Sequence, residues 1–298
     1  MSGPIPITDT LWLVPGEGRG RFPRSNAVLV RDREAVLVDT GCGLERLRAL
    51  RAEVRVDRVL NTHTHPDHAA GNFLFADRPI LVPEPGAASA GDLEALSIRF
   101  FDRPALRPRW RAFIREQMGF EDQHPKGAFA VDAELAVGET RLQVIPAPGH
   151  TADHCCFFEP EAGVLVSADI DLTGFGPWYG HPESDLPALR RSIARVKALA
   201  PRIVLSAHRP PLTEDKDDIQ GALDRFAAVI DERNERILAL LERERTLSQL
   251  VEAAPIYGRF PYAPELMRYW EEVMLRKHLE ELVERSLVEA RGAAFRRT

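Results

Sequence analysis

Four side chains that commonly bind metal ions lie within one six-residue segment, His63-Thr64-His65-Pro66-Asp67-His68. The segment follows an apolar run at residues 56–61 that is typical of a buried strand. Pro66 is well placed to begin a helix, which we expect over about residues 67–75. Imidazole nitrogens and carboxylate oxygens suit zinc and similar divalent ions. The segment therefore predicts a metal site where a strand ends and a helix begins.

Isolated histidines and aspartates follow three further predicted strands. These residues are His150, Asp169 and His208, which come after apolar runs at residues 142–148, 164–167 and 203–206. Taken alone, each of them is more often a surface or capping residue. Their shared position at the end of a strand favours a common site, because a convergent metal site needs ligands from several segments.

Composition limits the class of protein. The chain has 298 residues, of which 44% are hydrophobic and 28% charged, as in a soluble globular protein. The net charge of -6 gives no general attraction to nucleic acid or to an anionic membrane. The three cysteines, of which Cys155 and Cys156 are adjacent, argue against a disulfide framework. With no signal-peptide pattern and no membrane-spanning apolar run, we predict a cytoplasmic protein without a membrane partner.

The patterning divides the chain into a strand-rich part and a helical part. Within the strand-rich part, residues 84–128 show helical patterns, aromatic residues and prolines, so we predict a helical insert that covers the site. From residue 214 the pattern is mostly helical, with a short strand pair expected within 287–295. We therefore expect a catalytic domain at residues 1–212 and a C-terminal winged-helix-like domain at residues 213–298.

The order of these motifs resembles that of the metallo-β-lactamase superfamily over about residues 8–212. The resemblance rests on the pattern HxHxDH, followed by Gly149-His150-Thr151, a later Asp and a later His. It implies an αββα sandwich of the α/β (α+β) class, with two mixed sheets inside and helices outside. The helical end resembles the winged-helix-like domain of the subgroup that contains β-lactamase-like protein 2. That second resemblance rests on helix order and on the context of His278-Leu279.

The resemblance also implies a ligand set for two divalent ions. Zinc is the expected metal, with iron or manganese as alternatives. By resemblance, one ion is held by His63, His65 and His150, the other by Asp67, His68 and His208, and Asp169 bridges them. The complete set favours an active enzyme with two ions.

Several further residues are candidates to support the centre or to line a pocket. The match of Asp39-Thr40-Gly41 to the family implies that Asp39 supports ligand histidines. The other candidates are His154, Asp171, Trp178 and Tyr179. A solvated or capping role is the simpler interpretation of Asp171, and Cys42 is expected to pack rather than to reach the site. The bridging Asp usually follows a glycine in this family, but Asp169 follows Ala168.

Two such ions can hold a hydroxide at neutral pH, and this metal-bound hydroxide would attack a carbonyl carbon. Asp67 is expected to orient the nucleophile or to move a proton. The favoured function is hydrolysis of an acyl substrate, either a thioester, as in a thioesterase or glyoxalase II, or another ester or lactone. The alternatives are a metal-dependent endoribonuclease or phosphodiesterase, a mononuclear iron enzyme of the persulfide dioxygenase type, and a non-catalytic binding or dimerisation protein.

The expected partner is a small acyl substrate. Residues 174–180 are rich in glycine and aromatic side chains and are expected, with the insert, to line its pocket. Residues 214–298 carry 18 acidic and 14 basic side chains, a net charge of -4. Because a nucleic-acid-binding module is normally basic, we expect the C-terminal part to serve packing or a homodimer contact instead.

Overall fold

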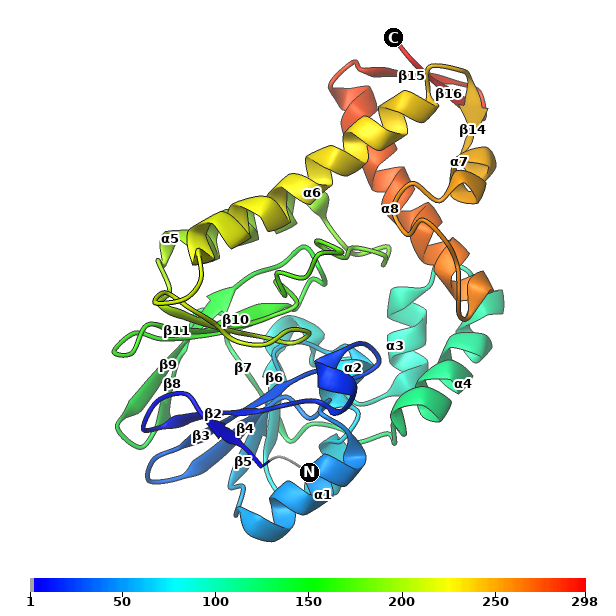
Figure 1. Cartoon of the computed structure of the whole chain (residues 1–298). Coiled ribbons are helices and arrows are strands. Elements are labelled where there is room, and N and C mark those ends of the chain that lie inside the picture. Colours follow the sequence, from blue (N-terminus) through cyan, green and yellow to red (C-terminus); the bar gives the residue numbers. More distant parts are fainter. Residues whose placement is uncertain (1–2) are drawn as a thin grey trace.

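Two β-sheets pack face to face, and helices cover the outer face of each sheet (Figure 1). The structure is a computed structural model, and it describes residues 3–298. The arrangement confirms the predicted αββα sandwich. Helix α1 (Leu44–Glu53) covers the first sheet, while α5 (Leu186–Ala198) and α6 (Ile219–Leu240) cover the second.

Within the described residues, the first sheet has seven strands in the order β1-β2-β3-β4-β5-β6-β7. The pairs from β1 to β4 are antiparallel and those from β4 to β7 are parallel. The strands are β1 (Ile5–Pro6), β2 (Leu11–Val14), β3 (Ala27–Arg31), β4 (Ala35–Val38), β5 (Arg58–Leu60), β6 (Ile80–Pro83) and β7 (Gly127–Phe129).

The second sheet has six strands over the same described range, in the order β13-β12-β11-β10-β9-β8. Its β11–β12 pair is parallel and the other pairs are antiparallel. The strands are β8 (Glu134–Val137), β9 (Thr140–Pro146), β10 (Cys155–Glu159), β11 (Val164–Ala168), β12 (Ile203–Ser206) and β13 (Leu212–Thr213).

Both faces of the central strands are buried, which explains their continuous apolar sequences. In β3, Val28 and Val30 face the core between the sheets, whereas Leu29 faces the outer core under α1. Across the inner core they meet side chains of the second sheet such as Val144 and Phe157. This rigid sandwich fixes the strand ends that carry the predicted ligands.

The predicted insert forms a helical layer between β6 and β7. It contains η4 (Pro104–Leu106) and two α-helices, α3 (Leu93–Phe100) and α4 (Arg107–Met118). The C-terminal part adds β14 (Arg245–Thr246), α7 (Leu247–Ala253), α8 (Pro264–Glu284), β15 (Val288–Arg291) and β16 (Ala294–Arg297). The insert packs against α8 in one apolar cluster. The winged-helix-like assignment and the division at residue 212 stay predictions.

One local prediction is wrong: the helix expected at residues 67–75 is broken. The remaining short helices are η1 (Glu17–Gly20), α2 (Pro66–Ala69), η2 (Asn72–Phe75) and η3 (Glu84–Gly86). The break has a clear cause, because the His68 carbonyl accepts a 2.7 Å hydrogen bond from the Thr40 backbone N–H. That carbonyl is thereby held by a neighbouring loop, and the α-helix ends after one turn.

Candidate metal centre

The predicted ligands all lie at the ends of strands, at one edge of the sandwich. The segment from His63 to His68 follows β5 and ends on α2. The other three follow strands of the second sheet, with His150 after β9, Asp169 after β11 and His208 after β12. The structure therefore brings together every residue of the predicted ligand set.

These side chains form two groups, each of which could hold a metal ion. Within a group, the potential ligand atoms lie within 4.8 Å of one another. The first group is His63, His65, His150 and Asp169, and the second is Asp67, His68 and His208. The histidines of the first group and all three residues of the second are those that the family resemblance assigned to separate ions, while Asp169, the expected bridge, falls in the first group.

Asp169 lies between the two groups and offers one oxygen to each. Its Oδ2 is 2.9 Å from His150 Nε2 and 3.8 Å from His63 Nε2. Its Oδ1 is 2.8 Å from His68 Nε2 and 3.5 Å from His208 Nε2. A carboxylate placed in this way is suited to bridge two ions.

Four of the ligand histidines are fixed by a hydrogen bond to the ring nitrogen that faces away from the centre. His68 Nδ1 lies 2.8 Å from Asp39 Oδ2, and His63 Nδ1 lies 3.0 Å from the Thr62 hydroxyl. His150 Nδ1 donates to the Trp178 carbonyl and His208 Nδ1 to the Gly20 carbonyl, each over 2.8 Å. Partners of this kind set the ring orientation and leave Nε2 for a metal.

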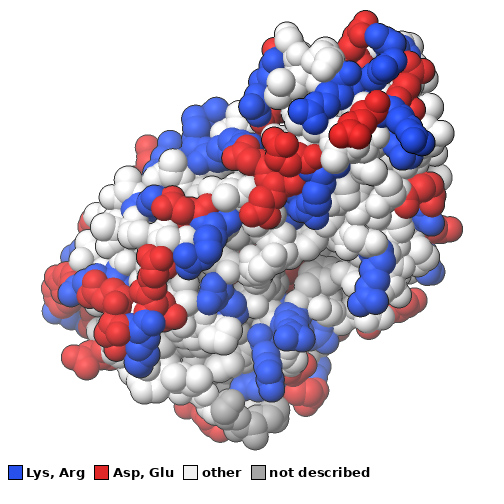
Figure 2. Space-filling model, turned by 45° about the horizontal axis from the view of Figure 1, so that its top comes forward, with Lys and Arg blue, Asp and Glu red and all other residues white. Residues whose placement is uncertain are grey.

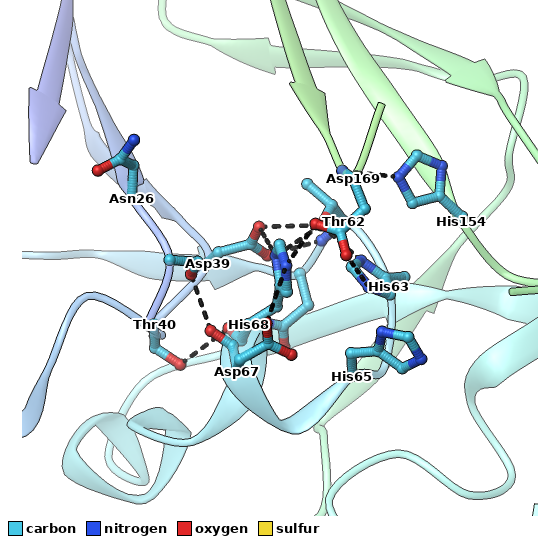
Figure 3. Close-up of polar contacts among 12 residues, drawn as sticks. Asn26, Asp39, Thr40, Thr62, His63, His65, Asp67, His68, His154 and Asp169 are labelled. Atoms are coloured by element: carbon cyan, nitrogen blue, oxygen red, sulfur yellow. Dashed lines mark hydrogen bonds and ion pairs between the residues drawn. The ribbon is translucent and has the colours of Figure 1, made fainter. Parts of the chain in front are cut away.

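Asp39 supports the centre as predicted, and Figure 3 shows it beside the ligand segment. Its carboxylate accepts hydrogen bonds from the Thr62 backbone N–H at 2.8 Å and from the Thr62 hydroxyl at 2.9 Å. Two residues further on, a Cβ on Gly41 would lie 1.4 Å from the Asp67 carbonyl oxygen. Only glycine therefore allows the loop after β4 to lie against the ligand segment.

The unpaired polar atoms of the centre fit a metal site. Among the described residues, His63 Nε2, His68 Nε2 and Asp169 Oδ1 are buried without a hydrogen-bond partner. Although His68 Nε2 and Asp169 Oδ1 are only 2.8 Å apart, they are not aligned as a hydrogen bond. Buried polar atoms are normally paired. Ligand atoms that lie within 4.8 Å of one another while several stay unpaired fit the binding of metal ions.

Burial and charge set the protonation of the site. Burial holds the pKa of His63 and His65 well below the usual range, which keeps both rings in the neutral form that binds metal. Burial also acts to lower the pKa of His68, but the Asp169 and Asp39 carboxylates outweigh it and hold that pKa well above its usual range. Burial raises the pKa of Asp67. The centre thus combines two neutral rings, His63 and His65, with three histidines whose pKa the Asp169 carboxylate raises against the effect of burial: His68, His150 and His208.

His154 contacts the centre without joining either ligand group. Its Nδ1 donates to the Ala147 carbonyl at 2.9 Å, and its Nε2 accepts a 3.2 Å hydrogen bond from the Asp169 backbone N–H. Burial lowers its pKa to about 4, so the ring is neutral and can accept. The residue before Asp169 has a φ of 46°, a backbone conformation that favours glycine. Ala168 adopts this left-handed backbone at a cost in strain.

The remaining candidates lie in different places. Trp178 and Asp171 line the cavity described below, and burial raises the pKa of Asp171 to about 6. Tyr179, in contrast, is fully buried, and its hydroxyl hydrogen-bonds with His278 Nε2 at 2.6 Å. It therefore lies behind the cavity wall, which corrects the expectation that it lines the pocket. Cys42 is buried in the outer core beneath α1, as expected of a packing residue.

Arg99 on α3 is a supporting residue that the sequence analysis missed. Its guanidinium donates to the Thr64 hydroxyl at 2.9 Å, to Asp153 Oδ1 at 2.6 Å and to Glu183 Oε1 at 2.7 Å. Asp153 in turn accepts from the Thr64 backbone N–H at 2.9 Å. Arg99 thus connects the insert to the two loops that carry His65 and the Gly-His-Thr motif. No motif distinguishes it from the other arginines of the insert.

A cavity of about 880 Å³ opens on the centre. Its floor includes residues of both ligand groups, and three of the segments in its walls carry most of the apolar side chains. Those segments supply Trp110, Ile114 and Met118 from α4, residues 171–178 from the loop after β11, and Tyr257, Met267 and Trp270 from the C-terminal part. The insert therefore covers the site as predicted, and the contribution of α8 is a finding that the sequence analysis did not anticipate.

A family model described as the metallo-beta-lactamase superfamily matches residues 20–208, which is more than half of the chain. The chain therefore belongs to the metallo-beta-lactamase superfamily. Together with the two ligand groups, this membership defines a metal-dependent hydrolase. Among the helices of residues 3–298, none combines the length and apolarity that crossing a membrane would require.

Named relatives and a solved structure are similar to this chain. The hydroxyacylglutathione hydrolase of Erythrobacter litoralis is 28% identical over 212 residues, which cover 70% of this chain and 68% of that protein. The acyl-coenzyme A thioesterase MBLAC2 of Bos taurus is 28% identical over 169 residues, or 51% of this chain and 60% of that protein. A metallo-beta-lactamase family protein of Thermus thermophilus has a TM-score of 0.74 at 23% identity, with 98% and 100% of the two chains covered. This last likeness shows the fold alone.

Proposed function

We propose that this protein hydrolyses acyl thioesters with two divalent metal ions, most simply zinc, bound at the candidate centre. The observation that carries the proposal is the cavity, because it joins the ligand groups directly to a large apolar wall. Trp110, Ile114 and Trp270 in that wall are buried side chains suited to contact an acyl chain. A nitrogen-rich ligand set suits zinc.

In the proposed reaction, water adds to the thioester carbonyl carbon, the C–S bond breaks, and an acid and a thiol are released. Two bound ions would supply Lewis acidity and make water acidic enough to react near neutral pH. Asp67 lies in the cavity floor, with its Oδ2 3.6 Å from His208 Nε2. Because burial raises its pKa, its carboxylate is suited to take the proton of the water and pass it to the leaving thiolate.

The relatives support this choice among acyl substrates. Two similar proteins are named as a hydroxyacylglutathione hydrolase and an acyl-coenzyme A thioesterase, and both names denote thioester hydrolysis. The presence of a second ligand group supports two ions over a single iron. A cytoplasmic location and a homodimer stay predictions of the sequence.

The test is thiol release from a panel of acyl thioesters by the purified protein loaded with zinc, manganese or iron, with metal content measured alongside. We expect hydrolysis and two metal ions per chain. His150→Ala should abolish thiol release because His150 belongs to the first ligand group. The matched control is His124→Ala, since His124 is exposed and belongs to neither ligand group.

Two results would contradict the proposal. One is hydrolysis of a lactone or of RNA by the same preparation without any thiol release. The other is thiol release that persists in His150→Ala.

A further inference from the structure

The lining of the cavity contains two chemically different sets of residues, which we call the apolar half and the basic half. The first half is apolar and includes Trp178, whose ring centroid is 5.8 Å from that of His65. The ring centroid of Trp178 in turn lies 6.0 Å from that of Trp270. An acyl chain placed here would contact aromatic and aliphatic side chains and no charge.

The second half is basic and lies beside His208. Arg19 and Arg21 flank Gly20, whose carbonyl accepts the hydrogen bond from His208 Nδ1, and Arg209 follows His208 in the chain. Arg259 lines the same cavity from the C-terminal part. Figure 2 shows basic side chains along much of the edge of the hollow. Four guanidinium groups from three segments therefore border one cavity.

In the part of the chain that the structure describes, these arginines have no acidic partner, whereas other arginines of the molecule form ion pairs with carboxylates. On the outer surface, Arg51 pairs with Asp77 and Arg190 with Asp231. Across residues 3–298, no carboxylate forms an ion pair with any of the four cavity arginines, which are Arg19, Arg21, Arg209 and Arg259.

Arg209 is the one arginine of this half whose guanidinium hydrogen bonds can be described in part. Its Nη1 donates to the Leu172 carbonyl at 2.7 Å, but its Nε is buried and has no acceptor in the described part of the chain. A buried donor without a partner is unfavourable. The acidic residues that line the cavity, Asp67, Asp169 and Asp171, belong to the centre or adjoin it. Anionic groups of a ligand are therefore the natural acceptors for this arginine cluster.

We propose that the basic half is a subsite for the phosphate groups of the leaving thiol, so that the preferred substrates are acyl thioesters of a phosphorylated pantetheine such as coenzyme A. This inference rests on the proposed function and deepens it. Guanidinium groups bind phosphate through paired hydrogen bonds, and four of them suit a carrier with several phosphate charges. On a chain with a net charge of -6, a local basic surface also draws a polyanionic substrate to the cavity.

The subsite fixes the direction in which the substrate lies. The acyl chain occupies the apolar half beside His65, the carbonyl lies over the centre, and the thiol extends over His208 toward the arginines. Hydrolysis then breaks the C–S bond at the boundary between the two halves, and the thiol leaves with the proton that Asp67 delivers.

The test compares one acyl group on three thiols: coenzyme A, 4′-phosphopantetheine and pantetheine. We expect kcat/KM for the coenzyme A thioester to exceed that for the pantetheine thioester by about tenfold or more, mainly through KM. In the variant Arg19→Gln/Arg21→Gln/Arg259→Gln this ratio should fall toward one. The phosphopantetheine thioester shows how much of the preference comes from the first phosphate. Added salt should reduce the ratio in the unmodified protein, since these charges are exposed.

A matched control removes three exposed arginines that lie away from the cavity, as Arg33→Gln/Arg48→Gln/Arg55→Gln. The ratio should stay as high in this control as in the unmodified protein. Equal hydrolysis of the coenzyme A and pantetheine thioesters would overturn the subsite and leave the proposed thioesterase function standing. Absence of thiol release from all three substrates would overturn both.

Discussion

The ligand centre and the cavity wall around it are built from different kinds of structure. The ligands follow strands of the two sheets, where backbone hydrogen bonds fix their positions. The wall combines α4, residues 171–178 and α8, which are distant in sequence and meet by side-chain packing. The difference indicates that the centre determines whether the reaction occurs, whereas the wall determines which substrate takes part. Substitutions at the centre should therefore change metal content and turnover, whereas substitutions in the wall should change substrate preference.

The largest effect is expected at the centre. Asp169→Asn removes the carboxylate charge between the ligand groups, so bound metal should fall below two ions per chain. Turnover should drop by about a thousandfold, equivalent to about 4 kcal/mol in activation free energy. Metal analysis and thiol-release kinetics measure both quantities. Asp171→Asn is the matched comparison, because Asp171 belongs to neither ligand group and should keep both metals. Full metal content in Asp169→Asn would refute the bridging role.

The next effect concerns the connection between the two regions. Arg99→Gln breaks the contacts that connect α3 with the loops of Thr64 and Asp153, and it leaves the buried Asp153 carboxylate without its cation. Metal affinity or activity should fall about 10- to 100-fold. Arg99→Lys should recover part of this loss. The control is Arg103→Gln, which removes a more exposed pair between the insert and Glu272 of α8. An equal loss in that control would mean that insert packing alone is responsible.

A smaller effect concerns the stability of the fold behind the cavity wall at acid pH. His278 hydrogen-bonds with the Tyr179 hydroxyl, and burial, helped by the charge of Arg233, lowers its pKa to about 3 from an ordinary value of 6.5. The unfolded chain therefore binds a proton that the folded chain excludes, and stability falls as pH drops from about 6.5 toward 3. Between pH 7 and pH 5 this group should remove about 2 kcal/mol of unfolding free energy.

The variant His278→Gln tests this assignment, because it removes the titrating group and keeps donor and acceptor capacity. Denaturant unfolding at the two pH values should show a smaller decrease in the variant than in the unmodified protein. An identical decrease would show that other groups cause the acid sensitivity.

The smallest effect is expected in the wall itself. Ile114→Phe adds volume to a buried position on α4 that lines the cavity. The kcat/KM for long acyl chains should fall about tenfold relative to short ones, with metal content unchanged. The same substitution at Ile98, which is 55% exposed on α3, is the control. A uniform loss over all chain lengths would indicate disturbed folding rather than a narrowed pocket.

At positions where a metal-binding residue type stands directly after an apolar strand, the sequence predicted which side chains lie together. Histidines and aspartates at the ends of apolar strands have few other roles, and so the residues that meet at the centre could be predicted from His63 through His208. Thr246 and Gln249 form a capping box at the start of α7, another feature that residue types at short spacing indicate. In both cases the signal lies in residue type and in short spacing along the chain.

The residues of the cavity wall could not be predicted, because side-chain packing leaves no signal in the sequence comparable to the metal-ligand motif. Trp110 and Trp270 are apolar residues of helices, and nothing in that pattern distinguishes a cavity wall from an ordinary core. Trp178 and Tyr179 show that the sequence does not distinguish a wall residue from a core residue even for two neighbours in the chain. The first lines the cavity while the second points into the core toward Arg233 and His278, because neighbouring residues of an extended loop face opposite sides.

The position of α8 in the wall also orders events during synthesis of the chain. Growth from the N-terminus brings every ligand, from His63 to His208, out of the ribosome before α8 has been made. The nascent protein therefore holds its complete ligand set while one side of the cavity is still open to solvent. Metal loading can precede the docking of α8, and the cavity wall is completed only when Met267 and Trp270 of that helix have been translated.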